Sequence, residues 1–85
     1  MQKPTVLLPT KEVLRRTGFS RTTLYSKIKG GLFICPVKLG ERNIGWPEQE
    51  VETLLRFIIS EPSNIELEGF VTRVHVGRTT DQVQL

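Results

Sequence analysis

The stretch that most limits how this chain can fold is Thr10 to Gly30, which reads TKEVLRRTGFSRTTLYSKIKG. Its centre carries Gly18 two residues before Ser20. A glycine readily adopts the positive φ at which many helices end, and a serine hydroxyl accepts from the free N–H groups of a helix that starts after it. The stretch therefore predicts one helix from Thr10 to about Thr17 and a second after Ser20.

Apolar spacing predicts how these two helices pack. Phe19 and Leu24 occupy the positions of a hydrophobic staple, which fixes the angle at which the chain enters a helix. Leu24 and Ile28 lie one turn apart and can pack against Val13 and Leu14. This is the pattern of a helix-turn-helix, although an ordinary helical hairpin has the same spacing.

Charge separates the two halves of the chain. Residues 1–46 carry nine lysines and arginines against two acids, whereas residues 47–85 carry three against seven. A basic region that also holds the two-helix pattern is typical of a protein that binds a polyanion. Solvating lysines explain a scattered excess better than one that lies in half of the chain.

Length and composition restrict the class of protein. The 85 residues fit one small domain, and a hydrophobic fraction of 38% with 25% charged residues is that of a soluble globular protein. No apolar run is long enough to span a membrane, and we expect neither a membrane partner nor a signal peptide. The single cysteine fits a reducing cytoplasm.

A short β-hairpin is predicted after the helices, from Val37–Leu39 to residues 43–46 across a turn with Gly40. Residues 6–8 are expected to lie extended over the core. Pro47 suits the first turn of a third helix. The side chains expected to face the core are Val37, Leu39, Ile44 and Trp46 of the hairpin, and Val51, Leu54, Leu55 and Ile58 of the third helix.

The segment from residue 61 to residue 85 alternates apolar and polar residues in Ile65–Glu68 and in Phe70–Val76. Alternation indicates one or two edge strands, while a mobile tail, mainly after Gly77, is an equal alternative. We therefore divide the chain into a winged helix-turn-helix domain, residues 1–60, and a C-terminal extension, residues 61–85.

No motif predicts an enzyme, a metal or another cofactor. Cys35 and His75 are far apart in the sequence, and no paired catalytic acids or phosphate-binding glycine loop are evident. His75 has no second ligand at metal-binding spacing.

Trp46 and Cys35 are expected to be buried side chains of the core.

The run from Leu7 to Ile58 resembles the AlpA family of prophage regulatory proteins, small DNA-binding proteins related to MerR-type winged helices and to phage excisionases. The matching segments, in order, are EVLRRTGFSRTTLY, GLFICPVKLGERNIGW and EVETLL. The resemblance implies a mainly α fold with a small β-hairpin. It also implies a transcription regulator or a directionality factor for prophage excision, located in the cytoplasm at the bacterial nucleoid. The extension after residue 60 departs from the family pattern.

On this interpretation the second helix enters the major groove of double-stranded DNA. Arg21 is the first candidate for a base contact, because a guanidinium binds guanine O6 and N7 together. Ser20 lies where a helix N-terminus attracts phosphate, and Thr22 and Thr23 offer hydroxyls or methyls. The remaining candidates are phosphate contacts, namely Arg15 and Arg16 of the first helix, Tyr25, Lys27 and Lys29 of the second, and Lys38 and Arg42 of the hairpin.

Some of these assignments have alternatives. Tyr25 is equally well explained as a half-buried core aromatic. Arg15 or Arg16 can pair with Glu12 on the surface, and Arg42 can enter a narrow minor groove instead of touching a phosphate.

Three functions remain open on the sequence: a transcription regulator, an excisionase that bends DNA and recruits an integrase, and an adaptor that binds an acidic protein. The first two predict double-stranded DNA as partner, with RNA polymerase or an integrase as the protein partner. One chain of this size reads about half a site, so repeated sites or self-association, on DNA or through the C-terminal segment, are also expected. The basic first half favours DNA.

Overall fold

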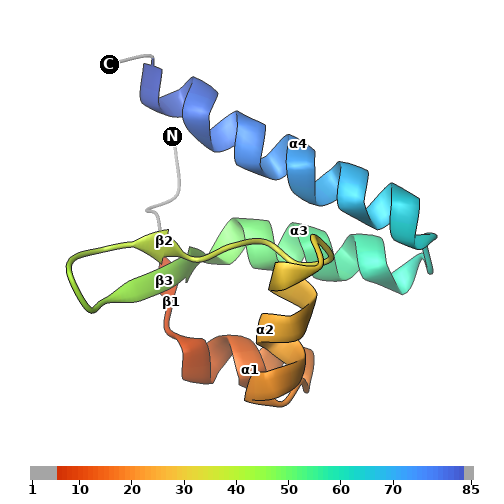
Figure 1. The fold of residues 1–85 in the computed structure, drawn as a ribbon, viewed down its shortest axis with the longest axis horizontal. Helices are drawn as coiled ribbons and strands as arrows, with labels where there is room; N and C mark the ends of the chain where they lie inside the picture. Colours follow the sequence, from red (N-terminus) through yellow and green to blue (C-terminus); the bar gives the residue numbers. More distant parts are fainter. Residues whose placement is uncertain (1–5, 84–85) are drawn as a thin grey trace.

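The computed structural model describes residues 6–83, which form four helices and a three-stranded antiparallel sheet (Figure 1). The strand order in the sheet is β1-β3-β2. The predicted helix-turn-helix, hairpin and third helix are all present. The elements, in chain order, are β1 (Leu7–Leu8), α1 (Thr10–Thr17), α2 (Arg21–Lys29), β2 (Val37–Lys38), β3 (Ile44–Pro47), α3 (Glu48–Ile59) and α4 (Asn64–Val83).

The turn between α1 and α2 has the predicted chemistry. Gly18 ends α1 in the left-handed conformation, with φ at 77°, and its N–H donates to the Leu14 carbonyl at 2.8 Å. Ser20 caps α2, since its Oγ accepts from the Thr23 N–H at 3.1 Å. Phe19, between these two residues, packs its ring edge-on against Phe33 at 6.0 Å between centroids. Both helix ends are therefore fixed by local side chains and by the core together.

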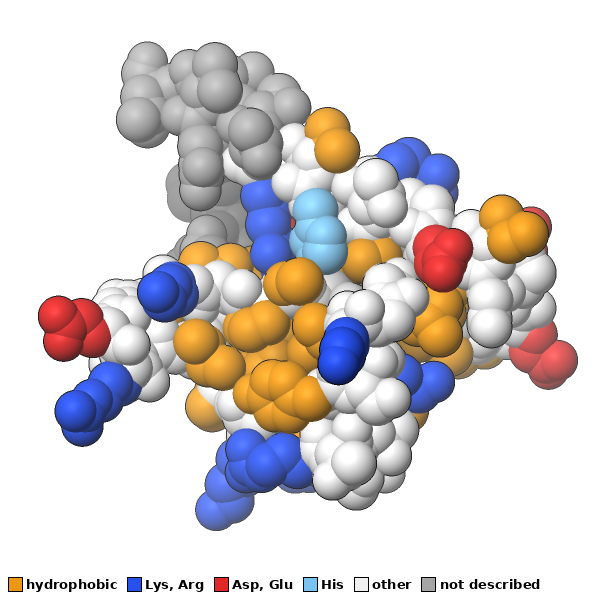
Figure 2. All heavy atoms as spheres, in the orientation of Figure 1, with side chains coloured by type: hydrophobic (Ala, Val, Ile, Leu, Met, Phe, Trp, Pro, Cys, Tyr) orange, Lys and Arg blue, Asp and Glu red, His pale blue; other side chains and the backbone are white. Residues whose placement is uncertain are grey.

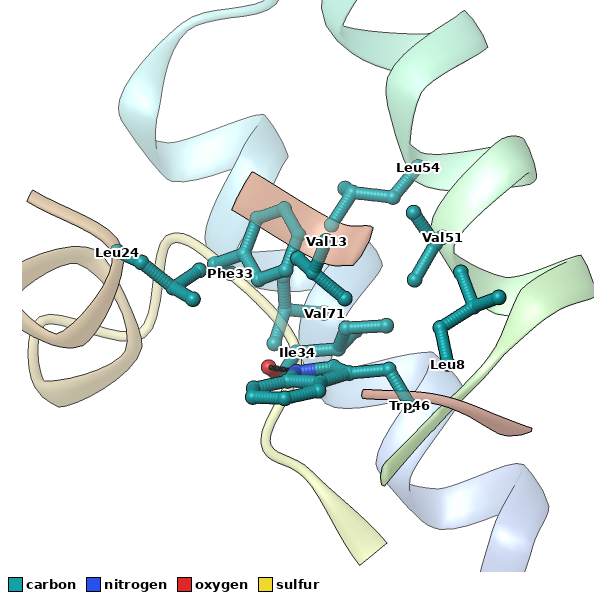
Figure 3. Close-up of a cluster of buried hydrophobic side chains, with 9 residues drawn as sticks. All are labelled: Leu8, Val13, Leu24, Phe33, Ile34, Trp46, Val51, Leu54 and Val71. Atoms are coloured by element: carbon teal, nitrogen blue, oxygen red, sulfur yellow. Dashed lines mark hydrogen bonds between the residues drawn. The ribbon is translucent and has the colours of Figure 1, made fainter. Parts of the chain in front are cut away.

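The core gathers apolar side chains from nearly every element (Figure 3). Trp46 of β3 is fully buried, as predicted, and its indole N–H donates to the Ile34 carbonyl at 3.1 Å, so its polar atom is satisfied. Burying a large apolar side chain stabilises the fold by about 1.5–3 kcal/mol. The buried apolar residues are Leu8, Val13, Leu24, Phe33, Ile34, Trp46, Val51, Leu54 and Val71.

The hairpin register corrects part of the predicted core. β2 and β3 pair with Val37 opposite Gly45 and Lys38 opposite Ile44, and beside the turn the Leu39 N–H donates to the Asn43 carbonyl at 2.8 Å. Opposite residues share a face of a sheet. Val37 and Leu39 therefore lie on the face of Gly45, away from Ile44 and Trp46, and Leu39 is 49% exposed. The prediction that all four hairpin side chains face the core is wrong for these two.

The C-terminal extension is a helix, so the predicted edge strands are wrong. A capping box precedes α4: the Ser63 N–H donates to Glu66 Oε1 at 2.8 Å, and the Glu66 N–H donates to Ser63 Oγ at 3.2 Å. The helix continues past Gly77 to Val83, so the alternative of a mobile tail is also wrong for these residues. Residues 84 and 85 lie outside the described residues. The residues that pack α4 onto the core follow a helical period: Leu67, Phe70, Val71 and Val74.

α4 lies along α3 in an antiparallel pair (Figure 1). The rings of Phe57 and Phe70 stack across this contact with centroids 4.6 Å apart. No helix among residues 6–83 has both the length and the hydropathy that crossing a membrane requires.

Candidate nucleic-acid interface

α2 buries Leu24 in the core, packs the partly buried Ile28 against it and turns most of its polar side chains to solvent. Leu24 is fully buried. Tyr25 is 38% exposed and is not part of the core cluster, so the structure argues against the alternative of a core aromatic. The exposed side chains of α2 are Arg21, Thr22, Thr23, Tyr25, Ser26 and Lys29.

Lys27 lies at the border between the core and this exposed face. Its Nζ is 5.4 Å from the ring centroid of Phe19, a cation–π distance. The aliphatic part of a lysine can cover apolar surface while its charge stays in water. Lys27 therefore covers the turn while keeping its ammonium group at the surface.

The N-terminus of α2 is closed by a pair of hydroxyls. Ser20 Oγ accepts from the Thr23 N–H and donates to Thr23 Oγ1 at 3.0 Å. Within residues 6–83, the N–H groups of Arg21 and Thr22 have no hydrogen-bond partner. A helix N-terminus with free N–H groups is suited to an anion.

The hairpin adds further exposed cations. Lys38, Arg42 and Asn43 are all exposed, as predicted. Figure 2 shows basic side chains (blue) projecting from the hairpin and from the side of α1 and α2, while acidic ones (red) lie at the hairpin tip and toward α4. The two elements that are predicted to contact DNA, α2 and the hairpin, thus both carry exposed positive charge.

The ion pairs among the side chains of residues 6–78 all involve three arginines, Arg15, Arg16 and Arg78. Arg15 and Arg16 both bind Glu12, the alternative that the sequence left open. These bonds lower the pKa of the Glu12 carboxyl to about 2. The candidates that make no ion pair within the described residues are Arg21, Lys27, Lys29, Lys38 and Arg42.

The acidic side chains of α3 are matched by arginines from other helices. Arg16 reaches Glu48 at 3.0 Å and Glu52 at 3.6 Å. Arg78 of α4 binds Glu50 through two guanidinium nitrogens. Sequence reasoning missed these pairs, because helix α4 and the approach of α1 to α3 are tertiary features. Each of the three glutamates of α3, Glu48, Glu50 and Glu52, therefore has an arginine partner.

The connection between α2 and β2 corrects the prediction for Cys35, which is exposed rather than buried. Its N–H donates to His75 Nε2 at 3.0 Å, and its carbonyl accepts from Arg78 Nη2 at 2.8 Å. Partial burial lowers the pKa of His75, and the nearby charge of Arg78 adds to this while Glu50 opposes it. Sequence reasoning missed this contact too. The i, i+3 spacing of His75 and Arg78 is its signal, but only once the segment is assigned as a helix.

A helix-turn-helix followed by a hairpin, with a third helix closing the core, defines the winged helix-turn-helix class. The family model described as prophage CP4-57 regulatory protein (AlpA) matches residues 7–57, more than half of the chain. The chain therefore belongs to the AlpA family, a family of regulators and not of enzymes. It matches no curated protein and no solved structure. The family match ends before α4.

Proposed function

We propose that this protein regulates prophage genes by binding specific sites on double-stranded DNA. α2 enters the major groove, and the hairpin follows the backbone or the adjacent minor groove. One observation carries the proposal: the described structure gives no ion-pair partner to the cations of α2 and the hairpin. Such cations are free to neutralise phosphates and to release counterions from DNA. They are Arg21, Lys27, Lys29, Lys38 and Arg42.

Within this proposal the side chains have distinct roles. Arg21, exposed in the first turn of α2, reads a guanine edge. Thr22 and Thr23 contact bases or phosphates, and a phosphate lies near Ser20. The residues that contact phosphates without reading sequence are Arg15, Tyr25, Lys27, Lys29 and Lys38, with Arg42 on a phosphate or in the minor groove.

Arg16 has a different role. Three carboxylates surround its guanidinium, and its side chain is 22% exposed. Its partners favour a structural function, which is to hold α1 against α3. We therefore replace its assignment as a phosphate contact by this one.

Selection of fragments from the source replicon, followed by fluorescence anisotropy on the best fragment across a salt series, tests the proposal. We expect binding that survives competitor DNA, with a slope of about −4 to −5 in log K against log salt, since each phosphate neutralised contributes about −0.9. Weak binding that is equal on all fragments would contradict it. A bound site at a promoter assigns transcription control, and one at an attachment site assigns an excision factor.

A further inference from the structure

α4 holds the main chain of Cys35 from two directions. The Cys35 N–H donates to His75 Nε2 at 3.0 Å, and the Cys35 carbonyl accepts from Arg78 Nη2 at 2.8 Å. Both backbone polar groups of this residue are thus bound by side chains one helical turn apart. Cys35 lies in the connection, residues 30–36, that leads from α2 to β2 (Figure 1).

α3 fixes the guanidinium that makes one of these bonds. Arg78 Nε lies 3.0 Å from Glu50 Oε1, and Nη2 binds the same carboxylate. Paired arginine–carboxylate bonds set the orientation of the guanidinium plane. Val71 and Val74 pack α4 onto the core just before this point. We call the two bonds from His75 and Arg78 to the Cys35 main chain the clamp. Both side chains belong to a helix that is packed on the core, so the clamp has a fixed base.

β2, the edge strand of the hairpin, has few other restraints. β2 is two residues long and pairs with β3 alone in the sheet. In the connection before it, Phe33 and Ile34 are buried, and the Cys35 backbone is the last point held before Pro36 and β2. Loosening that point would allow β2 and the turn of the hairpin to shift relative to α2, while the buried Trp46 keeps β3 in the core.

We infer that His75 and Arg78 are positioning residues, which act through the Cys35 main chain to keep the hairpin in the right place relative to α2 for DNA binding. This inference rests on the proposed function. It assigns a role to α4, the element that the family model does not cover.

The clamp requires a neutral imidazole. Nε2 can accept the Cys35 N–H only when it carries no proton, and a protonated ring offers two donors and no acceptor. The charged groups that face His75 are Arg78 on its own helix and Glu50 on α3; the third neighbour is the Cys35 backbone. Acidification below the pKa of His75 should therefore open the clamp.

Four variants separate positioning from general stability. His75→Leu removes the acceptor, whereas His75→Gln keeps an acceptor that does not titrate. Arg78→Ala removes the second bond. Arg73→Ala is its matched control, because it removes the same charge from an exposed site on α4 where the guanidinium lies over Phe70, 5.9 Å from the ring centroid. All are compared at a temperature well below their melting transitions.

The measurements are hydrogen exchange at the Cys35 amide and the salt dependence of binding to the selected fragment. We expect His75→Leu and Arg78→Ala to speed exchange about five- to tenfold and to weaken binding roughly tenfold. The slope of log K against log salt should become shallower by about 2, because the phosphate contacts of Lys38 and Arg42 would be lost. His75→Gln and Arg73→Ala should match the wild type. As the pH falls below the pKa of His75, which partial burial and the charge of Arg78 hold below its ordinary value, the wild type should approach His75→Leu, while His75→Gln should not.

The outcomes distinguish this inference from the proposed function. If the wild type binds its fragment, and the clamp variants release the Cys35 amide yet keep wild-type affinity and slope, the inference is overturned and the proposed function stands. If the wild type shows no preferred fragment, the proposed function fails, and with it the role of the clamp in DNA binding. Unchanged exchange in His75→Leu would overturn the clamp itself. Should Arg78→Ala not fold, the two His75 variants decide.

Discussion

Arg16 of α1 reaches Glu48 at the start of α3, with 3.0 Å between Nη2 and the carboxylate oxygen. The same guanidinium binds Glu12 at 2.8 Å and lies 3.6 Å from Glu52. Its neighbour Arg15 pairs with Glu12 alone, and its side chain is 70% exposed. These two adjacent arginines thus have different surroundings. We expect Arg16 to stabilise the fold and Arg15 to contact DNA.

Arg16→Ala should lower the melting temperature, because it leaves Glu48 and Glu52 without their partner at the junction of α1 and α3. Arg15→Ala should change it little, since an exposed pair contributes little to stability. In DNA binding the order reverses: Arg15→Ala should reduce the salt slope by about 1, and Arg16→Ala should leave it unchanged. Thermal melts and anisotropy on the same variants check both. A slope that falls for Arg16→Ala alone would return that residue to the DNA surface.

Glu12 should make stability depend on pH in the acid range. Hydrogen bonds from Arg15 and then Arg16 lower the pKa of its carboxyl from 4.5 to about 2 in the folded protein. The folded state therefore binds its proton later than the unfolded state as pH falls. The stabilisation is complete above about pH 4.5 and disappears as the pH approaches 2. Urea unfolding of the wild type and Glu12→Gln should differ at pH 7 and converge near pH 2. A gap of constant size would contradict the assignment.

Local chemistry explains why the helix-turn-helix and α3 could be predicted from sequence. Gly18 and Ser20 each act within a few residues of their own position, so their spacing specifies the turn whatever surrounds it. The apolar stripe of α3 is likewise a local periodic signal, and Val51 and Leu54 are buried as it predicts.

The errors arose where a pattern fits two structures or depends on distant partners. Residues 65–76 alternate like a strand, but Leu67, Phe70, Val71 and Val74 also fit a helical stripe, and the Ser63–Glu66 capping box decides for the helix. The face of Val37 depends on a register that composition does not reveal. Cys35 is exposed because its neighbours Phe33 and Ile34 fill the core. The arginine partners of α3 come from other helices and leave no local signal.

Gly18→Ala should destabilise the fold by about 1 kcal/mol. The position has φ at 77°, where an L side chain is strained, although nothing within 4 Å would meet the added methyl group. Gly40→Ala is the matched control, because the methyl also meets nothing there and φ is not in the left-handed region. Urea titration should show a loss for Gly18→Ala and little change for Gly40→Ala. Equal effects would mean that backbone strain does not set the cost.

Ser20 offers a way to separate helix capping from DNA contact. Ser20→Ala should cost about 1 kcal/mol of stability, since the Thr23 N–H loses its acceptor. Ser20→Asp should retain stability, because a carboxylate also caps and suits the positive end of the helix dipole. The same carboxylate should repel a phosphate, so Ser20→Asp should bind DNA more weakly than Ser20→Ala. The opposite order of affinities would place the N-terminus of α2 away from the DNA backbone.

Arg21 and Lys29 should differ in what they contribute to recognition. Both are exposed on α2, and neither has an ion-pair partner among the described side chains of residues 6–78. Arg21 lies in the first turn, nearest the bases, so Arg21→Ala should remove about 1–3 kcal/mol of discrimination at one base pair. Lys29→Ala, at the other end of the helix, should weaken binding to every sequence alike and reduce the salt slope by about 1. Anisotropy on the selected site and on single-base variants of it measures both quantities. If Arg21→Ala loses affinity equally on all of them, Arg21 touches the backbone, and the base-reading residue must be sought at Thr22 or Thr23, the other exposed side chains of that turn.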